Sequence, residues 1–353
     1  MKSLIFIVIF LLSVAVGAQS DTKPSIQGGL GWSADGRFIA VGTTAGVHIH
    51  ASDNLEKLLV LDETFYVKKI AWSNTDLRIA YEDSDGQSIY IYDAATGQRS
   101  ELRGAGPIHD IGWSATDTFI AATVGYGGGI VTWRVETGVE VMSVSLQAFH
   151  RIGSHVFEWG PDEKYLGYGG IVDGFAIFNA YTGQLFDLMW HRKYINVLKW
   201  SPDGNLLAAE GNGLMIWQIN QQHHPHDAKE GRLIGDLLYE RPGGFGPTWH
   251  PDSSKIAYVV TVHPEQDPQD ASDFSGSHAA IWDLASDTVV KLPGVFIRGT
   301  NNTWDVIEWS PDGSKLASIS SDGRIVIWNT NTHKIVAEYA GYRSILDYYA
   351  ENP

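Results

Sequence analysis

Apolar and polar residues alternate most regularly near the end of the chain, over residues 305–330. Three short apolar runs (VIEW, KLASIS and RIVIW) are separated there by two Asp-Gly pairs, Asp312-Gly313 and Asp322-Gly323. Alternation with a period of two is typical of a half-buried strand, and Asp-Gly favours the positive-φ backbone of a tight hairpin. The pattern predicts three antiparallel strands joined by two turns.

The same pattern recurs seven times along the chain. In each copy a tryptophan before a polar turn marks the first predicted strand, and a run with an aromatic residue or His in fourth place marks the third. Another apolar run lies between these marks, and an outer run follows, so each copy predicts four strands. The tryptophans are Trp32, Trp72, Trp113, Trp159, Trp200, Trp249 and Trp309. The fourth-place residues are His50, Tyr92, Trp133, Phe178, Trp217, Trp282 and Trp328.

One four-stranded sheet of this size cannot bury both of its faces, but seven sheets stacked radially cover one another. The repetition therefore predicts an all-β chain that folds as a seven-bladed β-propeller of four-stranded antiparallel blades. The propeller is expected over residues 30–341, between a lead-in at 19–29 and a tail at 342–353. The repeats are expected near 30–66, 67–106, 107–152, 153–193, 194–242, 243–302 and 303–341.

Several of these motifs resemble those of the WD-repeat propellers. The resemblance lies in WSPDG at 200–204 and 309–313, in SDG at 321–323, and in IWD and IWN at 281–283 and 327–329. It extends over nearly the whole chain after residue 25, although the Gly-His pair that usually opens a WD repeat is absent. The WSPDG form is also similar to propeller repeats of bacterial periplasmic proteins. The resemblance implies the fold and an exported bacterial-type member, and it says little about activity.

The first residues have the character of a secretory signal. Lys2 precedes an apolar run from Leu4 to Val16, and small residues end it at Ala18. A basic start, a short apolar run and such an ending predict cleavage after residue 18 and an exported protein, periplasmic or extracellular. After cleavage no membrane-spanning segment is expected, although an uncleaved anchor is the alternative. The chain has no cysteine, so disulfides cannot stabilise it, and its net charge of −16 argues against a nucleic-acid partner.

Two insertions break the repeat. In blade six the loop at 261–278 is acidic and polar, which suits a lid or a cation site, or simply a solvated loop. In blade five the insertion carries His223, His224 and His226, which are weak candidates for binding a transition metal. No metal site and no cofactor is expected, because adjacent histidines point apart and no partner ligands are evident.

Arginines recur in the connections that lead from one predicted blade to the next. By propeller geometry these connections lie on the face where the central channel opens, and guanidinium groups there suit a carboxylate or phosphate. The alternative is that each arginine braces its own crossover, which regular repetition favours. The residues expected to bind a ligand or partner on this channel face are Arg103, Arg151, Arg192, Tyr194, Arg241, Arg298 and Trp304.

Catalytic signatures are sparse in the sequence. It has no cysteine nucleophile, no G-x-S-x-G elbow and no phosphate-binding loop, so no catalytic residue is assigned. The favoured interpretation is a non-catalytic platform that binds a protein or peptide, with an anionic glycan or small anion as other ligands. The alternative is a propeller hydrolase or lyase that acts on a carbohydrate or peptide.

The ends of the chain bear on how the ring closes. Repeat seven has its own fourth strand at 334–340, and the first strand of repeat one is expected to start near Leu30. The ring is therefore expected to close without exchange of a strand, with Tyr342 in the tail packed over the seam.

Overall fold

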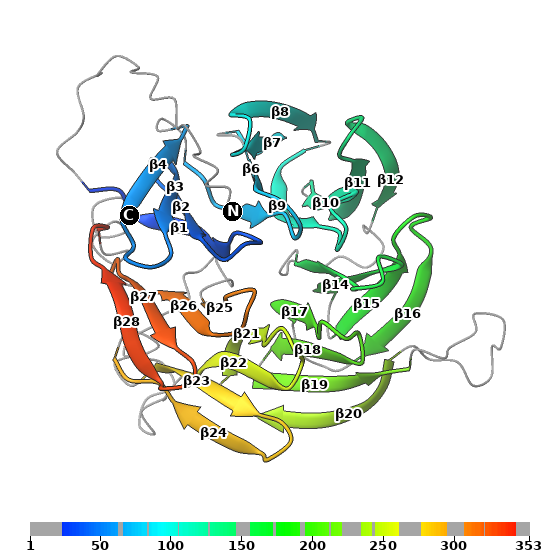
Figure 1. The fold of residues 1–353 in the computed structure, drawn as a ribbon. Coiled ribbons are helices and arrows are strands. Elements are labelled where there is room, and N and C mark those ends of the chain that lie inside the picture. Colours follow the sequence, from blue (N-terminus) through cyan, green and yellow to red (C-terminus); the bar gives the residue numbers. More distant parts are fainter. Residues whose placement is uncertain are drawn as a thin grey trace, which may run out of the picture.

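Seven antiparallel sheets surround a central axis as the blades of a ring (Figure 1). Each sheet has four strands, and strands that follow one another in the sequence are neighbours in the sheet. The fold is the seven-bladed β-propeller that the repeats predict. This computed structural model describes residues 23–62, 66–82, 85–104, 106–125, 128–145, 156–171, 174–190, 195–211, 213–220, 234–241, 244–260, 277–294, 307–320 and 322–343.

Each blade runs from an inner first strand to an outer fourth strand (Figure 1). Blades one and two comprise β1 (Ile26–Trp32), β2 (Phe38–Thr43), β3 (Gly46–Ala51), β4 (Lys57–Leu61), β5 (Ile70–Trp72), β6 (Arg78–Glu82), β7 (Ser88–Asp93) and β8 (Gln98–Arg103). Blades three and four comprise β9 (Ile108–Trp113), β10 (Phe119–Val124), β11 (Gly129–Arg134), β12 (Val139–Ser145), β13 (Phe157–Trp159), β14 (Tyr165–Ile171), β15 (Gly174–Asn179) and β16 (Leu185–Trp190).

The remaining three blades complete the ring. Blades five and six comprise β17 (Val197–Trp200), β18 (Leu206–Gly211), β19 (Gly213–Ile219), β20 (Ile234–Arg241), β21 (Gly244–Trp249), β22 (Lys255–Val260), β23 (His278–Asp283) and β24 (Thr288–Lys291). Blade seven comprises β25 (Ile307–Trp309), β26 (Lys315–Ile319), β27 (Ile325–Asn329) and β28 (Lys334–Tyr339).

The regular stretch near the end of the chain forms the predicted meander. β25 pairs with β26 and β26 with β27, all antiparallel. Gly313 and Gly323 occupy the turns with φ of 71° and 84°, the left-handed region that glycine adopts without strain. The two Asp-Gly pairs therefore serve the scaffold.

The core lies between the blades, where fourth-place rings of the third strands are buried. Trp282 and Trp328 are 0% and 1% exposed, and His50 takes the same position in blade one at 0%. Tyr92 of blade two is only partly buried. Large rings fill the gaps between twisted sheets because each contributes a large apolar area to both blades.

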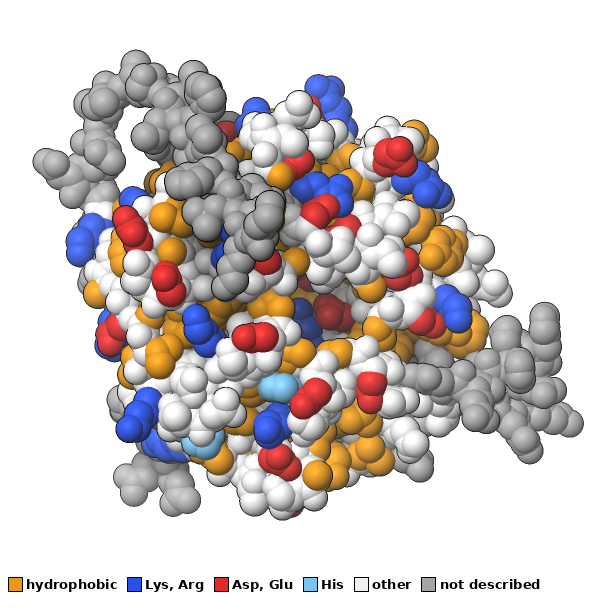
Figure 2. Space-filling model, in the orientation of Figure 1, with side chains coloured by type: hydrophobic (Ala, Val, Ile, Leu, Met, Phe, Trp, Pro, Cys, Tyr) orange, Lys and Arg blue, Asp and Glu red, His pale blue; other side chains and the backbone are white. Residues whose placement is uncertain are grey.

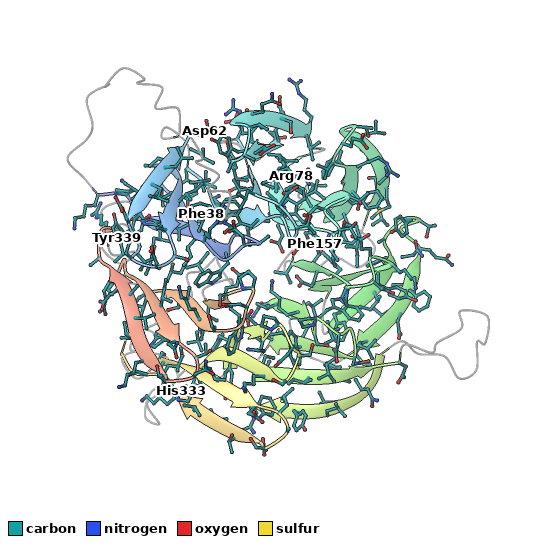
Figure 3. The ribbon with its side chains drawn as sticks, in the orientation of Figure 1. Phe38, Asp62, Arg78, Phe157, His333 and Tyr339 are labelled. Carbon is teal, nitrogen blue, oxygen red and sulfur yellow. The ribbon has the colours of Figure 1, made fainter. Side chains whose placement is uncertain are left out.

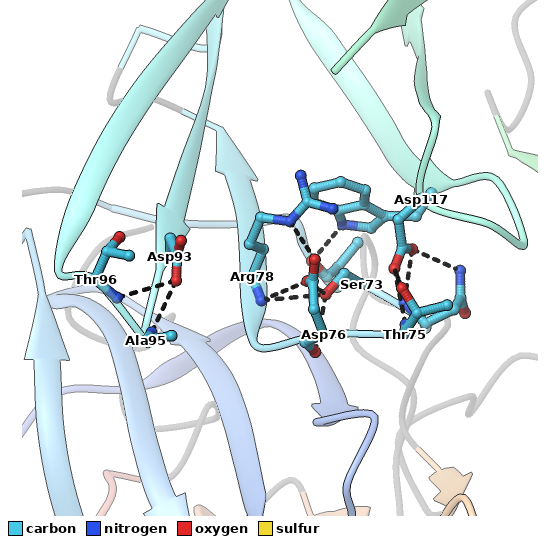
Figure 4. Close-up of polar contacts among 11 residues, drawn as sticks. Ser73, Thr75, Asp76, Arg78, Asp93, Ala95, Thr96 and Asp117 are labelled. Atoms are coloured by element: carbon cyan, nitrogen blue, oxygen red, sulfur yellow. Dashed lines mark hydrogen bonds and ion pairs between the residues drawn. The ribbon is translucent and has the colours of Figure 1, made fainter. Parts of the chain in front are cut away.

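Turns at one end of the blades hold neighbouring blades together (Figure 4). Asp117, in the first turn of blade three, accepts hydrogen bonds from the amides of Asn74 (2.7 Å) and Thr75 (2.8 Å) in blade two. Glu163 of blade four accepts one from the amide of Thr116 (2.6 Å) in blade three. These bonds satisfy turn amides that strand pairing leaves open.

The ring closes without strand exchange, because β1 to β4 and β25 to β28 form separate sheets. The Trp32 indole donates to the carbonyl of Glu308 across the seam (3.1 Å), and the amide of Arg343 donates to the carbonyl of Pro24 (2.9 Å). Tyr342 is buried at the seam, as expected.

One expectation about the first blade is corrected: β1 begins at Ile26, before the predicted start near Leu30, with a register shift between them. Gly28 makes this extension possible. A Cβ at Gly28 would lie 2.8 Å from the Cα of Gly42, so only glycine lets the two strands approach this closely.

Candidate functional site

A cavity of about 570 Å³ lies on the axis of the ring, lined mainly by the innermost strands of the blades. Its size is within the range of ligand-binding pockets. On the face shown in Figure 2, basic and acidic side chains are visible inside the central hollow. Phe157, labelled in Figure 3, is among the apolar residues that line it.

Indole hydrogen bonds make the wall of this cavity rigid. Five of the repeated tryptophans donate from Nε1 to the carbonyl of the residue that precedes the tryptophan of an adjacent blade. The five pairs are Trp32–Glu308, Trp113–Ala71, Trp159–Gly112, Trp249–Lys199 and Trp309–Thr248, with donor–acceptor distances of 2.8 to 3.2 Å. The Nε1 atoms of Trp72 and Trp200 are buried without a partner among the described residues. Most joints between blades are therefore fixed at the axis itself.

The first charged group in the cavity joins blades two and three. Lys69 lies 3.4 Å from Asp110, and their side chains are 12% and 15% exposed. The other oxygen of Asp110 accepts a hydrogen bond from the amide of Phe157 in blade four (3.3 Å). Asp110 therefore connects three blades through one carboxylate.

A second charged group occupies the positions directly before the tryptophans. Lys199 lies 3.4 Å from Glu158, with side chains 30% and 28% exposed. Glu308 accepts a hydrogen bond from the amide of Trp32 across the seam (3.1 Å). Since a partly exposed ion pair such as Lys199–Glu158 is only modestly stabilising, a charged group of a ligand can replace one of its two members.

The turn end of the cavity is uncharged. The second residue after six of the seven repeated tryptophans lines it; five of these residues are Ala or Pro and one is the uncharged polar Asn74: Ala34, Asn74, Ala115, Pro161, Pro202 and Pro311. An entering side chain would therefore pass an apolar mouth before it meets the ion pairs. Such an arrangement suits a long side chain with a charged end.

Two buried carboxyl groups occupy equivalent places on the second strands of blades two and five. Glu82 accepts a hydrogen bond from the amide of Lys68 (2.7 Å), and Glu210 accepts one from the side chain of Asn196 (3.2 Å). Burial raises the pKa of Glu82 to about 7 and that of Glu210 to about 8. Because burial disfavours the charged form, Glu210 is mostly protonated at neutral pH, whereas Glu82 is close to the midpoint of its titration.

Of the predicted binding arginines, the structure describes Arg103 and Arg241. The side chain of Arg103 is 85% exposed at the end of β8 and lies 3.4 Å from Glu101. Arg241 instead reaches blade six, where its guanidinium lies 4.1 Å above the ring of Trp282 and pairs with Asp287. The two arginines stand at similar places in their repeats, yet Arg241 braces two blades and Arg103 faces solvent.

The other predicted site residues lie outside the described part of the chain. They are Arg151, Arg192, Tyr194, Arg298, Trp304 and the three histidines His223, His224 and His226. Residues 1–18 and most of the loop at 261–278 also lie outside it. Within the described ranges no group of three or more His, Asp or Glu side chains is placed to hold a metal ion.

The cavity residues were missed by reasoning from the sequence, although a signal was present. Lys69 and Asp110 stand three residues before their tryptophans, and Glu158, Lys199 and Glu308 stand one residue before theirs. In an inner strand, residues with this spacing share one face because side chains alternate. Charged residues at such repeated positions indicate a polar channel.

Comparison with known proteins agrees with this architecture. The family model described as WD40, the WD domain or G-beta repeat, matches residues 295–329, which include β25 to β27. The chain is a seven-bladed β-propeller, and its last blade is similar to a WD40 repeat. The propeller is similar in structure to the β-propeller domain of Cps50 (Swd1) from Myceliophteria thermophila, with a TM-score of 0.66 and 15% identity. The match covers 88% of this chain and 98% of that domain, and at this identity it concerns the fold alone.

Two curated relatives align along most of the propeller. The anaphase-promoting complex subunit cdh1 of Dictyostelium discoideum is 29% identical over 83% of this chain. The cell division cycle 20.1 protein of Arabidopsis thaliana, a cofactor of the APC complex, is 21% identical over 76% of it. The matches cover 40% and 64% of these relatives' own lengths. Among the described residues, the propeller has no helix of the length and apolar character that a membrane crossing requires.

Proposed function

We propose that this propeller is a non-catalytic, exported interaction module that binds a protein or peptide through the face and mouth of its central channel. The observation that carries the proposal is the axial cavity, with an apolar mouth and ion pairs behind it. Its wall is held by indole bonds between blades, so a partner meets a surface that is already formed. Such preorganisation reduces the entropy lost on binding.

The names of the relatives support a protein partner. One is a subunit of the anaphase-promoting complex, one is a cofactor of the APC complex, and a third is the chromatin assembly factor 1 subunit FAS2 homolog of Oryza sativa. This third relative is 27% identical over 37% of the chain. Each of these names describes a member of an assembly, and we infer the same kind of role for this chain.

The partner's chemistry follows from the cavity. Three carboxylates and two lysines line it, so a segment with a basic side chain is the favoured occupant. Arg103 lies at the opposite end of blade two, level with the start of the inner strand, so it is not part of this mouth. Export rests on the sequence of residues 1–18, which has the three parts of a secretory signal.

Site-specific photocrosslinking in the native host tests this proposal. Benzoylphenylalanine replaces either Ala115, which lines the cavity mouth, or Ser143, an exposed residue on the outer strand of the same blade. We expect Ala115 to give one discrete protein adduct and Ser143 to give none. Mass spectrometry of the same adduct should show a chain that begins at Gln19. Equal crosslinking at both positions, or none at Ala115, would contradict binding at the mouth, and an intact leader would contradict cleavage after residue 18.

A further inference from the structure

Two histidines and a tyrosine form a continuous hydrogen-bond chain where the ring closes. His50 Nδ1 lies 2.9 Å from the carbonyl oxygen of Leu55, and His50 Nε2 lies 2.6 Å from the hydroxyl of Tyr342. The same hydroxyl lies 3.0 Å from His48 Nδ1, and His48 Nε2 lies 3.2 Å from the carbonyl oxygen of Ala45. Both histidines come from β3 in the first blade, whereas Tyr342 follows the last strand of the seventh.

This hydrogen-bond chain lies at the seam where blades one and seven meet and the propeller closes. The amide next to Tyr342, that of Arg343, donates to the carbonyl of Pro24, and Arg343 forms a parallel bridge with Ser25. His50 stands where other blades have an aromatic ring, so Tyr342 and its partners fill the corresponding space. We call residues 339–343 the closing segment, since they connect the seventh blade to the residues just before β1.

When all three side chains are neutral, this hydrogen-bond chain has one hydrogen fewer than its contacts require. Each of its four contacts needs one hydrogen, because both ends are carbonyl oxygens that can only accept. A neutral imidazole supplies one hydrogen and the tyrosine hydroxyl supplies one, which makes three. With His50 Nδ1 donating to Leu55 and Tyr342 donating to His50, His48 Nδ1 donates to the hydroxyl. The lone pair of His48 Nε2 then faces the Ala45 oxygen.

One added proton completes the chain, whereas a second breaks it. A proton on His48 Nε2 supplies the missing hydrogen to Ala45, and all four contacts are then satisfied. With a second proton both imidazoles carry two hydrogens, so both donate to the Tyr342 oxygen and the hydroxyl hydrogen has no acceptor in the chain. Two adjacent buried cations would also repel each other across this oxygen.

The surroundings oppose charge on either ring. His48 and His50 are 3% and 0% exposed, and the ammonium group of Lys57 acts on both. The ring of Tyr339, labelled in Figure 3 on β28, packs 4.8 Å from that of His50 and also faces Tyr342. Burial, followed by Lys57, lowers the pKa of His48 to about 4, and burial also lowers the pKa of His50.

We propose that His48, His50 and Tyr342 form an acid-sensitive latch, which holds the closing segment at neutral pH and releases it when both histidines become protonated. Release exposes imidazoles that take up protons at an ordinary pKa of 6.5, so acid favours the open form. For His48 alone, a pKa that rises from about 4 to 6.5 on opening favours the open form by about 30-fold at pH 5. The effect begins as the pH falls below 6.5.

Hydrogen exchange of the full chain tests the latch directly. The Arg343 amide reports on the closing segment, and the Leu292 amide, which donates to the carbonyl of Ala279 in blade six, is the reference. After correction for intrinsic exchange, we expect Arg343 protection to fall between pH 6.5 and 5 with a slope that approaches two protons, or 100-fold per pH unit. Leu292 should keep its protection.

The variant H50F separates the latch from general acid sensitivity. Phenylalanine fills this place in blade four, so the fold is retained, and one titrating histidine is left on Tyr342. Its slope should fall to one proton, or tenfold per pH unit. Nitrogen NMR of the histidine rings in the native protein provides a second readout. It should show both rings neutral at pH 7, each with its hydrogen on Nδ1. Parallel loss of protection at Leu292, an unchanged slope in H50F, or pH-independent protection of Arg343 would overturn the latch.

Discussion

A side chain's role in this protein depends on its neighbours in the next blade more than on its place in the repeat. Arg103 and Arg241 both end an outer strand. Arg103 meets Glu101 of its own strand, whereas Arg241 stacks on Trp282 and pairs with Asp287, both in the next blade. Trp282 also donates to Asp287 (3.0 Å), so the three side chains form one cluster between blades five and six. A guanidinium stacked on an indole is held by cation–π attraction and by packing.

Removal of this arginine should therefore destabilise the protein. We expect Arg241→Ala to lower the free energy of unfolding by about 1 kcal/mol, because the pair is partly exposed and screened by water. Arg103→Ala, the matched control, should change it by less than about 0.5 kcal/mol. Urea denaturation followed by tryptophan fluorescence measures both. Equal effects of the two substitutions would mean that the stacking on Trp282 contributes nothing.

At the scale of elements, the first turns of the blades use two kinds of residue at their left-handed position. Gly36, Gly204 and Gly313 adopt the left-handed conformation there without strain. In three other blades Asp117, Glu163 and Ser253 hold the same conformation, with φ of 57° to 65°, although a side chain makes it less favourable. Their side chains accept hydrogen bonds from the adjacent turn, which offsets this strain.

Asp117 provides the sharpest test of whether hydrogen bonds to the side chain outweigh the backbone strain. Asp117→Gly relieves the backbone strain but removes acceptors for two amides and for the Thr75 hydroxyl (2.6 Å). We expect a net loss of about 1 kcal/mol in the free energy of unfolding, since bonds to a charged acceptor outweigh the strain. Asp117→Asn keeps one acceptor oxygen and tolerates positive φ, so its loss should be smaller. Thermal denaturation measures the order of stability of the native protein and the two variants. A glycine variant more stable than the native protein would refute the explanation.

For the whole molecule, two sets of buried titratable groups shape stability in opposite directions. His48 and His50 have lowered pKa values, so their contribution is present above pH 6.5 and is lost as the pH falls toward 4. Glu82 and Glu210 have raised pKa values, so stability is lost as the pH rises from 4.5 to about 7 and 8 respectively. The optimum is therefore expected on the mildly acidic side of neutrality.

The alkaline side of this profile can be removed by substitution. Between pH 6.5 and 8 both carboxyls are ionised in the unfolded chain, whereas the folded chain still holds protons on them. The free energy of unfolding of the native protein should therefore fall by about 2 kcal/mol over this range. The double variant Glu82→Gln with Glu210→Gln keeps an oxygen acceptor at each place and has no proton to lose. Its stability should be nearly constant over that range, as judged by urea midpoints. A slope equal to that of the native chain would assign the effect to other groups.

The blades, their strand order and their central tryptophans could all be predicted from the sequence. Alternation and turn chemistry are local, so runs such as VIEW and KLASIS with Asp312-Gly313 between them specify strands and hairpins without distant information. Closure without strand exchange also followed, because repeat seven contains all four of its strands. The start of β1 was misplaced, since the close approach of Gly28 and Gly42 is not visible in a pattern of polarity.

The candidate site depended on tertiary structure. Alternation along the inner strands could have indicated that Lys69 and Asp110 face the channel, but not that they pair with each other. The brace at Arg241 and the latch at Tyr342 join residues that are far apart in the sequence, 46 positions for Arg241 with Asp287 and 292 for Tyr342 with His50. The sequence alone determined how many blades form and how each is built, because those choices depend on near neighbours. Only the closed ring decided which charges meet, which arginine is engaged and what holds the two ends together, because those contacts exist once the first and last blades are adjacent.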